Sequence, residues 1–600
     1  MPSPTSSRRA ALIALIALVG LSVPTTAQAA ARTDCRPVPT PAADILRASD
    51  AWSTFGVDGS GVRVGVISDS FGTAGEDVVA ADVAAGWLPG PGNPCGWTTP
   101  TRVVLDNSTS ASDEGRAMAQ LVHGIAPGAE LMFAAPPTSD NAGLAVAIDA
   151  LRDAGADIIV DDLAADDDLA YERLAAGYAV QRAVDAGVLY VSAAGNFGRP
   201  GAEGYPSAGY PVSGWSSTRY RPMPCAADVE QSALASAPEI TAVDCMDVDP
   251  GPGSDPGLGV TLLPGFATLS NLHWAQKAGS VTTHLGLGVK NLSTGELKVV
   301  WASDPERPLV PSALSGLGSA DPTEWEVSIV RRVTPEASTP AVSIVMPNVV
   351  RFLAVAALEY FHSTETDDIG ASLIGHEADP ATLAVAAVNA SDLTLGTYSS
   401  AGPATTLFGV PTATTVPGPA LAGVDGLPVS LPMDGEQNLF FGTSAAAPTV
   451  AAVAALAVQA APGTTPAALR AALVDGARAD AFASPWPSTL EASRFSGAGL
   501  TDAVATVAAV LPPAPTPTPT PVPTSVPTPT SVPTPTAVPA PDPTAAPAAA
   551  PPPGRLAESG TSIDGVALGA GVLSLIAGLV VVRARRRRRN GSDAAVTGRR

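Results

Sequence analysis

Short apolar segments alternate with longer segments of helical character over roughly the first two hundred residues. Val62–Ile67 is a short apolar run bounded by glycine, which is typical of a strand buried in a parallel sheet. The other expected strands are Glu130–Ala135, Asp157–Val160 and Val188–Ala193, and the expected helices are Arg116–Val122, Ala145–Ala154 and Ala175–Ala186. This alternation predicts an α/β fold built on a parallel sheet.

The pattern changes after about residue 205, where proline and glycine become frequent and helical periodicity is lost. Short strand-like runs replace it, and these are Val260–Leu263, Ala267–Leu269, Val281–Leu285, Lys298–Trp301, Trp325–Ile329 and Ala341–Met346. Such runs predict a β-sandwich inserted into the α/β domain. The α/β pattern returns with an expected strand at Thr382–Val388 and a long helix of small residues at Ala445–Ala461.

The N-terminus has the features of a signal peptide. Arg8 and Arg9 precede an apolar run over Ala10–Val23, and Ala27-Gln28-Ala29 fits an A-x-A cleavage site. The run is short for a membrane span. We therefore expect export and cleavage after Ala29.

The C-terminal region predicts a stalk followed by an anchor. Pro512–Pro553 consists of Pro, Thr, Ala, Val and Ser, a composition that favours extended polyproline II and acts as a semi-rigid spacer. An apolar stretch, Val566–Val582, is just long enough to span a membrane, and Arg585–Arg589 should hold its end in the cytoplasm.

Leu556–Gly560, the apolar stretch and the basic tail together resemble a cell-wall sorting signal of Gram-positive bacteria. The pentapeptide fits the LAxTG variant at Ala557, whereas Ser559 stands in place of threonine. The resemblance implies cleavage by a sortase and attachment to the cell wall. The alternative is a plain membrane anchor on a Pro-rich stalk. Both place the main domain outside the cell.

These features divide the chain into six segments. They are a signal peptide (1–29), the first part of the α/β domain (30–205), the inserted β-sandwich (206–370), the second part of the α/β domain (371–511), the linker (512–555) and the sorting signal or anchor with its basic tail (556–600).

Charge and cysteine content agree with an extracellular location. The net charge is −23 although the C-terminal tail is basic, which argues against nucleic acid as a partner. Four cysteines in an oxidising compartment predict two disulfides. Three pairings are open, and we favour Cys35–Cys95 with Cys225–Cys245. No C-x-x-C spacing indicates a structural zinc site.

Gly442–Pro448 is the sharpest chemical motif in the chain. Ser444 lies at the start of an expected helix after a glycine turn, so its own N–H and the helix dipole would face an oxyanion formed there. Serine is also a preferred helix N-cap, and taken alone the motif would be read as a cap.

Three further motifs occur with it, and the set resembles the subtilisin-like peptidases, or subtilases. Gly442–Pro448 matches their GTSMAxP motif with Ala445 in place of methionine, and Asp69 follows a buried strand as their catalytic aspartate does. Asn196 ends an AAGN motif, and Ser399–Pro403 matches SSxGP. The resemblance covers about residues 60–205 and 375–510. It implies a doubly wound parallel sheet, Ser444 as nucleophile, Asp69 in the triad and Asn196 in the oxyanion hole.

The histidine motif of the family, HGTxVA, is matched at Asp113–Ala119 with Glu114 in the histidine's place. The sedolisins, relatives on the same fold, use a Ser-Glu-Asp arrangement and work in acid. They replace the oxyanion asparagine with aspartate, whereas Asn196 is retained here. His123 would lie about 13 Å along the helix from Glu114 and about 180° around it, so we expect it to face elsewhere. The other histidines are His273, His284, His362 and His376. None of them stands in a motif that would give it a catalytic partner.

A glutamate base needs a raised pKa, because an ordinary carboxylate is a weak base at neutral pH. Asp69 beside Glu114 would raise one of the two pKa values, since two close carboxylates do not ionise together easily. Asp162 would add a third carboxylate, because its strand resembles the one that lines the substrate cleft in subtilases. The sequence thus predicts a serine endopeptidase that favours acidic pH and acts on a protein or peptide.

The alternative function is a catalytically inactive surface protein that binds or adheres through the same fold. We expect no cofactor and no metal in the catalytic site. Subtilases often bind a structural Ca²⁺ ion, but no loop here has a recognisable calcium pattern, and we expect Asp166–Asp168 to be a solvated acidic turn.

Overall fold

The computed structural model describes seven stretches of the chain. They are residues 35–106, 112–263, 267–302, 310–318, 323–346, 355–433 and 438–512. The expected signal peptide, the linker beyond Pro512 and the expected anchor lie outside the described residues.

A seven-stranded sheet with the order β2-β3-β1-β4-β5-β18-β21 forms the centre of the α/β part, and every pairing within it is parallel. Its strands are β1 (Arg63–Ile67), β2 (Arg102–Leu105), β3 (Glu130–Ala134), β4 (Ile158–Asp161), β5 (Leu189–Ala193), β18 (Leu383–Asn389) and β21 (Leu421–Asp425). Because β18 and β21 follow the insertion, two distant stretches of sequence complete one sheet.

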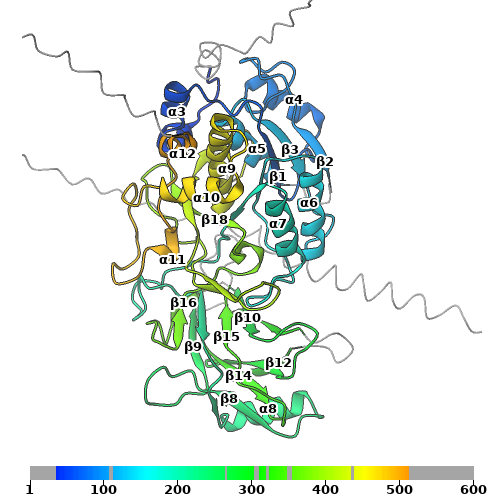
Figure 1. Ribbon diagram of the computed structural model, residues 1–600. Helices are drawn as coiled ribbons and strands as arrows, with labels where there is room; N and C mark the ends of the chain where they lie inside the picture. Colours follow the sequence, from blue (N-terminus) through cyan, green and yellow to red (C-terminus); the bar gives the residue numbers. More distant parts are fainter. Residues whose placement is uncertain are drawn as a thin grey trace, which may run out of the picture. The chain divides into compact units, whose positions relative to one another are not determined.

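Helices cover both faces of this sheet. Val64 and Val66 of β1 belong to one core with α5 (Glu114–Ile125) and α9 (Thr443–Ala460), whereas Ile67 belongs to a second core with the helices of the other face. Those helices are α6 (Asn141–Asp153) and α7 (Ala175–Asp185), which lie side by side in Figure 1. Apolar residues on both faces of each strand are what a doubly wound parallel sheet requires. The predicted fold class is therefore confirmed.

The remaining helices lie around this centre. They are α2 (Pro41–Ile45), α3 (Ala48–Phe55), α4 (Glu76–Ala85), α10 (Pro466–Asp475), α11 (Ser493–Ser496) and α12 (Ala503–Val510). The two short hairpins pair β19 (Ala404–Thr406) with β20 (Thr414–Val416) and β22 (Leu427–Pro428) with β23 (Leu439–Phe440). The end of the domain is fastened to its beginning, since the Ala503 N–H donates to the Leu46 carbonyl at 2.8 Å.

Two antiparallel sheets lie between β5 and β18 in the sequence, where the β-sandwich was predicted. One contains β13 (Ser312–Gly318), β10 (Ala267–Trp274), β15 (Val342–Val345), β6 (Gly214–Ser217) and β17 (Asp367–Ile369). The other contains β12 (Leu297–Trp301), β11 (Leu285–Asn291), β14 (Thr323–Arg332), β8 (Val243–Met246) and β7 (Pro222–Met223), with β9 (Leu258–Leu262) and β16 (Val355–Leu358) paired at its side. A single apolar core draws residues from both sheets, including Trp215, Trp274, Leu287 and Ile329. That is the packing expected of a sandwich.

Two details of this region differ from the sequence prediction. The expected strand Val281–Leu285 is wrong, because the strand β11 begins only at Leu285. Glycines within β11 interrupt the apolar pattern by which a strand is recognised in a sequence. Glycine is required at position 286, because a Cβ there would lie 2.9 Å from the Val300 carbonyl oxygen. The loss of helical periodicity also concealed α8 (Ala227–Ser236), in which only Val229 and Ala233 are buried.

Both favoured disulfides are confirmed. Cys35 bonds to Cys95, and Cys225 bonds to Cys245.

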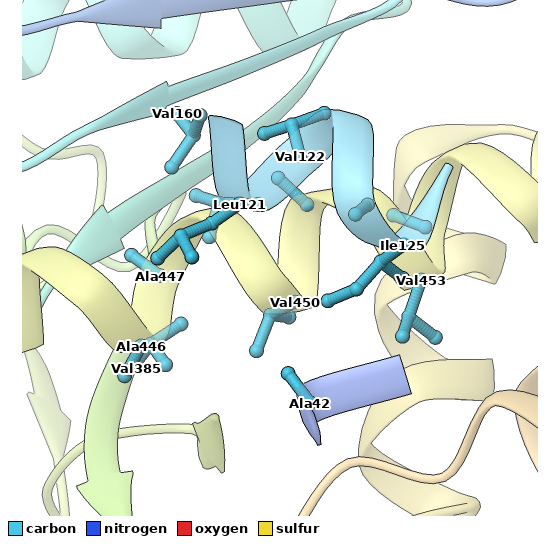
Figure 2. Packing of buried hydrophobic residues seen from close by; sticks show 14 of the residues in the cluster. Ala42, Leu121, Val122, Ile125, Val160, Val385, Ala446, Ala447, Val450 and Val453 are labelled. Carbon is cyan, nitrogen blue, oxygen red and sulfur yellow. The ribbon is translucent and has the colours of Figure 1, made fainter. Parts of the chain in front are cut away.

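The helix α9 has the length and composition of a membrane span, but 83% of it is buried inside the protein, as in the core helix of a soluble domain. It packs against α5, with Val450 and Val453 beside Leu121 and Ile125 in Figure 2. Alanines on α9 keep the two helices close. Because Glu114 begins α5 and Ser444 is the second residue of α9, this packing sets the position of one relative to the other.

Candidate active site

Ser444 is held at the start of a buried helix. It follows Gly442, whose φ of +100° is a conformation that side chains rarely adopt. The Gly442 N–H donates to Asp425 at 2.8 Å, and a Cβ on Gly442 would lie 3.1 Å from the Asn196 side-chain nitrogen. Ser444 is only 7% exposed. The serine therefore stands at a constrained turn, as the motif predicts, with its N–H among the free donors of a helix N-terminus.

Glu114 lies in the same site as this serine. The side chains of Asp162 and Ser444 both interact with its carboxyl group and favour its charged form. The residue begins α5 after Asp113, which has a left-handed φ of 55°. The structure thus brings together a nucleophile and a carboxyl group that come from helices more than three hundred residues apart in sequence.

Asp69 and Asp162 reach the same place from neighbouring strands. They follow β1 and β4, which pair in parallel, so both side chains lie beyond the carboxyl edge of the sheet. Asp69 accepts hydrogen bonds from the Glu114 N–H at 3.2 Å, from the Ser70 hydroxyl at 3.0 Å and from the Ser112 hydroxyl. Asp69 was expected to orient the Glu114 carboxyl. It accepts a hydrogen bond from the backbone of Glu114, and its negative charge acts on the Glu114 carboxyl together with the side chain of Asp162.

The electrostatics favour protonated carboxyl groups. Burial, followed by the charge of Asp69, raises the pKa of Glu114. Burial and then the charge of Glu114 raise the pKa of Asp162 well above its usual value. Because the charge on one carboxyl group disfavours the charge on the other, Glu114 and Asp162 lose their protons in two steps, and between these steps the pair holds one proton.

Asn196 is oriented by the residue before the nucleophile. Its side-chain oxygen accepts hydrogen bonds from the N–H of Thr443 at 2.9 Å and from the Thr443 hydroxyl at 3.0 Å. With the oxygen held there, the amide nitrogen is turned toward the start of α9. Ser400 fixes the loop on both sides of Asn196, because its N–H donates to Gly195 at 2.9 Å and its hydroxyl accepts from the Phe197 N–H at 3.3 Å.

Sequence reasoning missed several residues that hold the site. Asp425, the last residue of β21, accepts from the Gly442 N–H and from the Tyr398 hydroxyl. Thr443, Ser70 and Ser112 were also missed. A short polar residue directly after an apolar strand or before a nucleophile is the signal that could have found Asp425 and Thr443.

A buried ion-pair network holds the head of α5. Asp113 accepts from the Thr73 N–H at 2.8 Å and pairs with Arg116 at 3.0 Å, and Arg116 pairs in turn with Asp82. Although burial opposes it, these hydrogen bonds lower the pKa of Asp113. The network fixes the first turn of the helix and thereby Glu114.

Three histidines that were considered as catalytic bases have neighbours other than Ser444. His123 faces a small cavity that is also lined by Cys35, Trp52 and Cys95, and burial lowers its pKa to about 4. His273 is buried in β10 of the insertion. His376 lies in the short helix η1 (Gly375–Ala378) and contacts Asp161 at 2.9 Å.

The expectation of a solvated turn at Asp166–Asp168 is wrong for its last residue. Asp166 and Asp167 are exposed, whereas Asp168 is 8% exposed and accepts a hydrogen bond from the Asn141 side-chain nitrogen at 2.9 Å. The chain turns Asp168 inward toward η1, a change of direction that the run of three aspartates did not indicate.

Comparisons with known proteins find a family match over part of the chain. A model of the Subtilase family matches residues 356–499, the part of the chain that contains β18, β21 and Ser444. This match supports a serine protease. No curated protein matches the chain.

Solved structures of proteases also resemble the chain, at low identity. CspB protease of Clostridium perfringens is 13% identical, with a TM-score of 0.47 over 79% of this chain and 99% of that one. MycP1 of Mycobacterium smegmatis is 16% identical, with a TM-score of 0.33 over 82% of this chain and 90% of that one. The maturation protease PagA is 12% identical, with a TM-score of 0.36 over 77% and 98%.

Proposed function

We propose that the protein is a serine endopeptidase of subtilase type that uses Ser444, Glu114 and a pair of aspartates, and that it favours acidic pH. The observation that carries this proposal is that α5 packs on α9, with Glu114 and Ser444 in their first turns and the side chains of Asp162 and Ser444 acting on the Glu114 carboxyl. A nucleophile, a base within hydrogen-bond reach and a third group that orients the base form the minimum set for acyl transfer.

In the first step, Glu114 takes the proton of the Ser444 hydroxyl while the oxygen attacks the carbonyl carbon of the scissile peptide bond. The negative charge that develops on the carbonyl oxygen is met by the Asn196 amide nitrogen and the Ser444 N–H. Glu114 then returns the proton to the leaving amine, which departs and leaves an acyl-enzyme. Water, deprotonated by Glu114, completes hydrolysis and regenerates Ser444.

The aspartates allow glutamate to do the work of a histidine. Asp162 in its protonated form donates to the Glu114 carboxylate and orients it toward Ser444. The burial of Glu114 and then the negative charge of Asp69 raise the pKa of the base, so that it accepts a proton more readily than an ordinary carboxylate does. The working form carries one proton on the pair. Activity therefore falls at low pH, where both carboxyl groups are protonated, and again as the pH rises and the shared proton is lost.

We further propose that the enzyme works outside the cell on protein or peptide substrates. Its two disulfides suit an oxidising compartment. The signal-peptide pattern and the C-terminal anchor pattern support secretion and attachment to the cell wall by a sortase or to the membrane.

A fluorophosphonate probe tests the proposal, because it reacts with an activated serine. The full-length chain is incubated with the probe from pH 3 to pH 8, and the labelled residue is identified by mass spectrometry. We expect labelling of Ser444 that is strongest in acid and absent in Ser444→Ala. No labelling at any pH, together with no cleavage of a peptide library, would instead favour the inactive binding protein.

A further inference from the structure

A second group of ionisable side chains lies behind the candidate active site and takes no part in the proposed chemistry. It consists of His376, Glu377, Asp168 and Asp161, which we call the sealed cluster. Their exposed fractions are 2%, 5%, 8% and 0%. They come from η1, from the turn after β4 and from the end of β4 itself, so the fold gathers them from three places.

Three potential ligand atoms converge within this cluster. One atom each from Asp168, His376 and Glu377 lies within 4.8 Å of the other two. The His376 Nδ1 and Glu377 Oε2 atoms are 3.2 Å apart. Both are buried, and neither has a hydrogen-bond partner among the residues that the structure describes. Two lone-pair atoms that face each other without a hydrogen bond call for a cation or a proton between them.

Gly375 leaves space at the point where the three potential ligand atoms converge. Gly375 has a φ of +73°, and a Cβ there would lie 2.4 Å from the Asp168 Oδ2 and 2.7 Å from the Glu377 Oε2. Both oxygens therefore border the space that the missing side chain leaves.

The outer contacts orient the three groups. The His376 Nε2 is 2.9 Å from the Asp161 Oδ1, which also accepts from the Ser192 hydroxyl at 3.1 Å. This contact turns the His376 Nδ1 into the cluster. A histidine with one ring nitrogen on a carboxylate and the other directed at a shared point is the arrangement found around bound metals. Asn141 holds the other carboxylate, because its side-chain nitrogen donates to the Asp168 Oδ1 at 2.9 Å.

The charge balance also calls for a cation. Three buried carboxyl groups surround one imidazole, and buried charge of one sign is costly unless it is compensated. Arg173 of the neighbouring segment is already engaged, since it makes a bidentate pair with Asp379 at 2.6 and 2.7 Å.

We propose that Asp168, His376 and Glu377 bind a divalent transition-metal ion, for which Zn²⁺ is the best fit. One nitrogen and two carboxylate oxygens are ligands that zinc accepts, with bonds of about 2.0–2.2 Å. In a tetrahedral site such bonds place neighbouring ligands about 3.3 Å apart, close to the 3.2 Å between the His376 and Glu377 atoms. Calcium prefers six to eight oxygen ligands, so an imidazole disfavours it.

The ion would have a structural role next to the catalytic site. It would tie η1 to the turn after β4, and Asp161, which orients His376, directly precedes Asp162 of the Glu114 pair. The proposal stands apart from the peptidase function, because it rests on different side chains and is tested by metal binding.

Metal analysis of the full-length chain provides the test. The protein is stripped with a chelator, exposed to excess Zn²⁺ or Ca²⁺, desalted and measured by inductively coupled plasma mass spectrometry and by competition with a chromogenic chelator. We expect one tightly held Zn²⁺ per chain and at least a hundredfold weaker zinc binding in His376→Ala and in Glu377→Gln. The matched control is His273→Ala, which removes an equally buried histidine from the insertion and should bind zinc as the unaltered chain does.

A measurement on the unaltered protein covers the case in which these variants do not fold. Co²⁺ in place of Zn²⁺ should give the visible absorption of a four-coordinate site, and pulsed electron paramagnetic resonance should detect one imidazole nitrogen. The proposal is overturned if the folded chain retains no transition metal, if it binds Ca²⁺ alone, or if folded His376→Ala and Glu377→Gln keep full zinc affinity. Fluorophosphonate labelling of Ser444 is read separately, so either proposal can fail without the other.

Discussion

Two acidic clusters lie on either side of the carboxyl end of β4, and consecutive residues supply one aspartate to each. Asp162 joins Glu114, Asp69 and the Ser444 hydroxyl, whereas Asp161 joins His376, Glu377 and Asp168. Successive residues of a strand point to opposite sides, which separates the two carboxyl groups despite their adjacency.

The partners of each cluster decide what it can do. The catalytic cluster contains a buried hydroxyl group and carboxyl groups that share a proton, and its residues Asp69, Glu114 and Asp162 remain partly exposed. Such a group can exchange protons with a substrate. The sealed cluster contains an imidazole nitrogen that converges with two carboxylates and is almost fully buried. The same residue type thus favours proton transfer in one setting and cation binding in the other.

The Glu114→Gln variant should show the largest effect on activity. Without that effect, the contrast between a proton-transferring cluster and a cation-binding cluster would be wrong. Glu114→Gln removes the base and should lower kcat for a fluorogenic peptide by about 10³–10⁴-fold at the optimal pH. The control is Glu130→Gln on the exposed first residue of β3, which should stay within about twofold of the unaltered enzyme. An active Glu114→Gln enzyme would exclude Glu114 as the base and leave the catalytic cluster without a function.

The second-largest effect on kcat is expected when the oxyanion donor Asn196 is replaced. Asn196→Ala removes the amide nitrogen that Thr443 orients, and kcat should fall by about 10²–10³-fold with little change in KM. The folded fraction of each variant is measured by circular dichroism and used to calculate kcat, because loss of folded enzyme would also lower the apparent kcat at constant KM. A rise in KM at constant kcat would show that Asn196 only binds substrate.

Changes at Asp162 sharpen the assignment of the shared proton. The hydrogen bond from Asp162 lowers the pKa of Glu114. Asp162→Ala removes it, so the acid limb of the pH–rate profile should move to higher pH and kcat should fall about tenfold. Asp162→Asn keeps a donor and should leave the acid limb in place. The alkaline limb should then weaken, because an amide does not lose its proton. Identical profiles for both variants would contradict the shared proton.

The smallest expected effect concerns stability. The pKa of Glu114 is raised in the fold, so its contribution is most favourable below its usual pKa of 4.5 and is lost as the pH rises through the folded value. Glu114→Gln should therefore raise Tm at pH 7 by about 2–4 °C and change it little at pH 4. Scanning calorimetry at the two pH values measures this difference.

Asp113→Asn provides the opposite case within the same helix turn. The pKa of Asp113 is lowered, so its contribution is present above the usual value of 3.8 and is lost on acidification. This variant should lower Tm at pH 7, and the difference should shrink as the pH falls. Changes of the same sign in both variants would contradict the pKa directions.

The α/β architecture could be predicted because its signals are local. The strands β1, β3 and β5 begin or end within one residue of their predicted limits, since buried parallel strands form apolar runs bounded by glycine. In the insertion the signals are weaker. The strand β11 is buried almost throughout and contains two glycines, so it shows no apolar–polar alternation, and α8 buries too few residues to show a helical period.

Within the site, the sequence identified Ser444, Glu114, Asp69, Asn196 and Asp162, because each follows a strand or begins a helix in a recognisable motif. It could not assign the contacts among them. Asp69 accepts a hydrogen bond from the Glu114 N–H, and both Asp69 and Asp162 act on the Glu114 carboxyl. This arrangement depends on side-chain directions at two neighbouring strand ends. The supporting contact from Asp425 to Gly442 joins residues 17 positions apart in a way that no motif indicated.

The sequence alone therefore determined the fold class and the chemically able residues, which rest on local patterns and residue type, whereas it left three disulfide pairings open and the structure shows the favoured one. Tertiary structure alone decided that Asp168 turns inward, that His376 meets Asp161, and that Asp161 and Asp162 serve different clusters. Burial and the distances between segments far apart in the chain fix these outcomes. Those are the quantities that set the protonation of a carboxyl group and the convergence of ligand atoms.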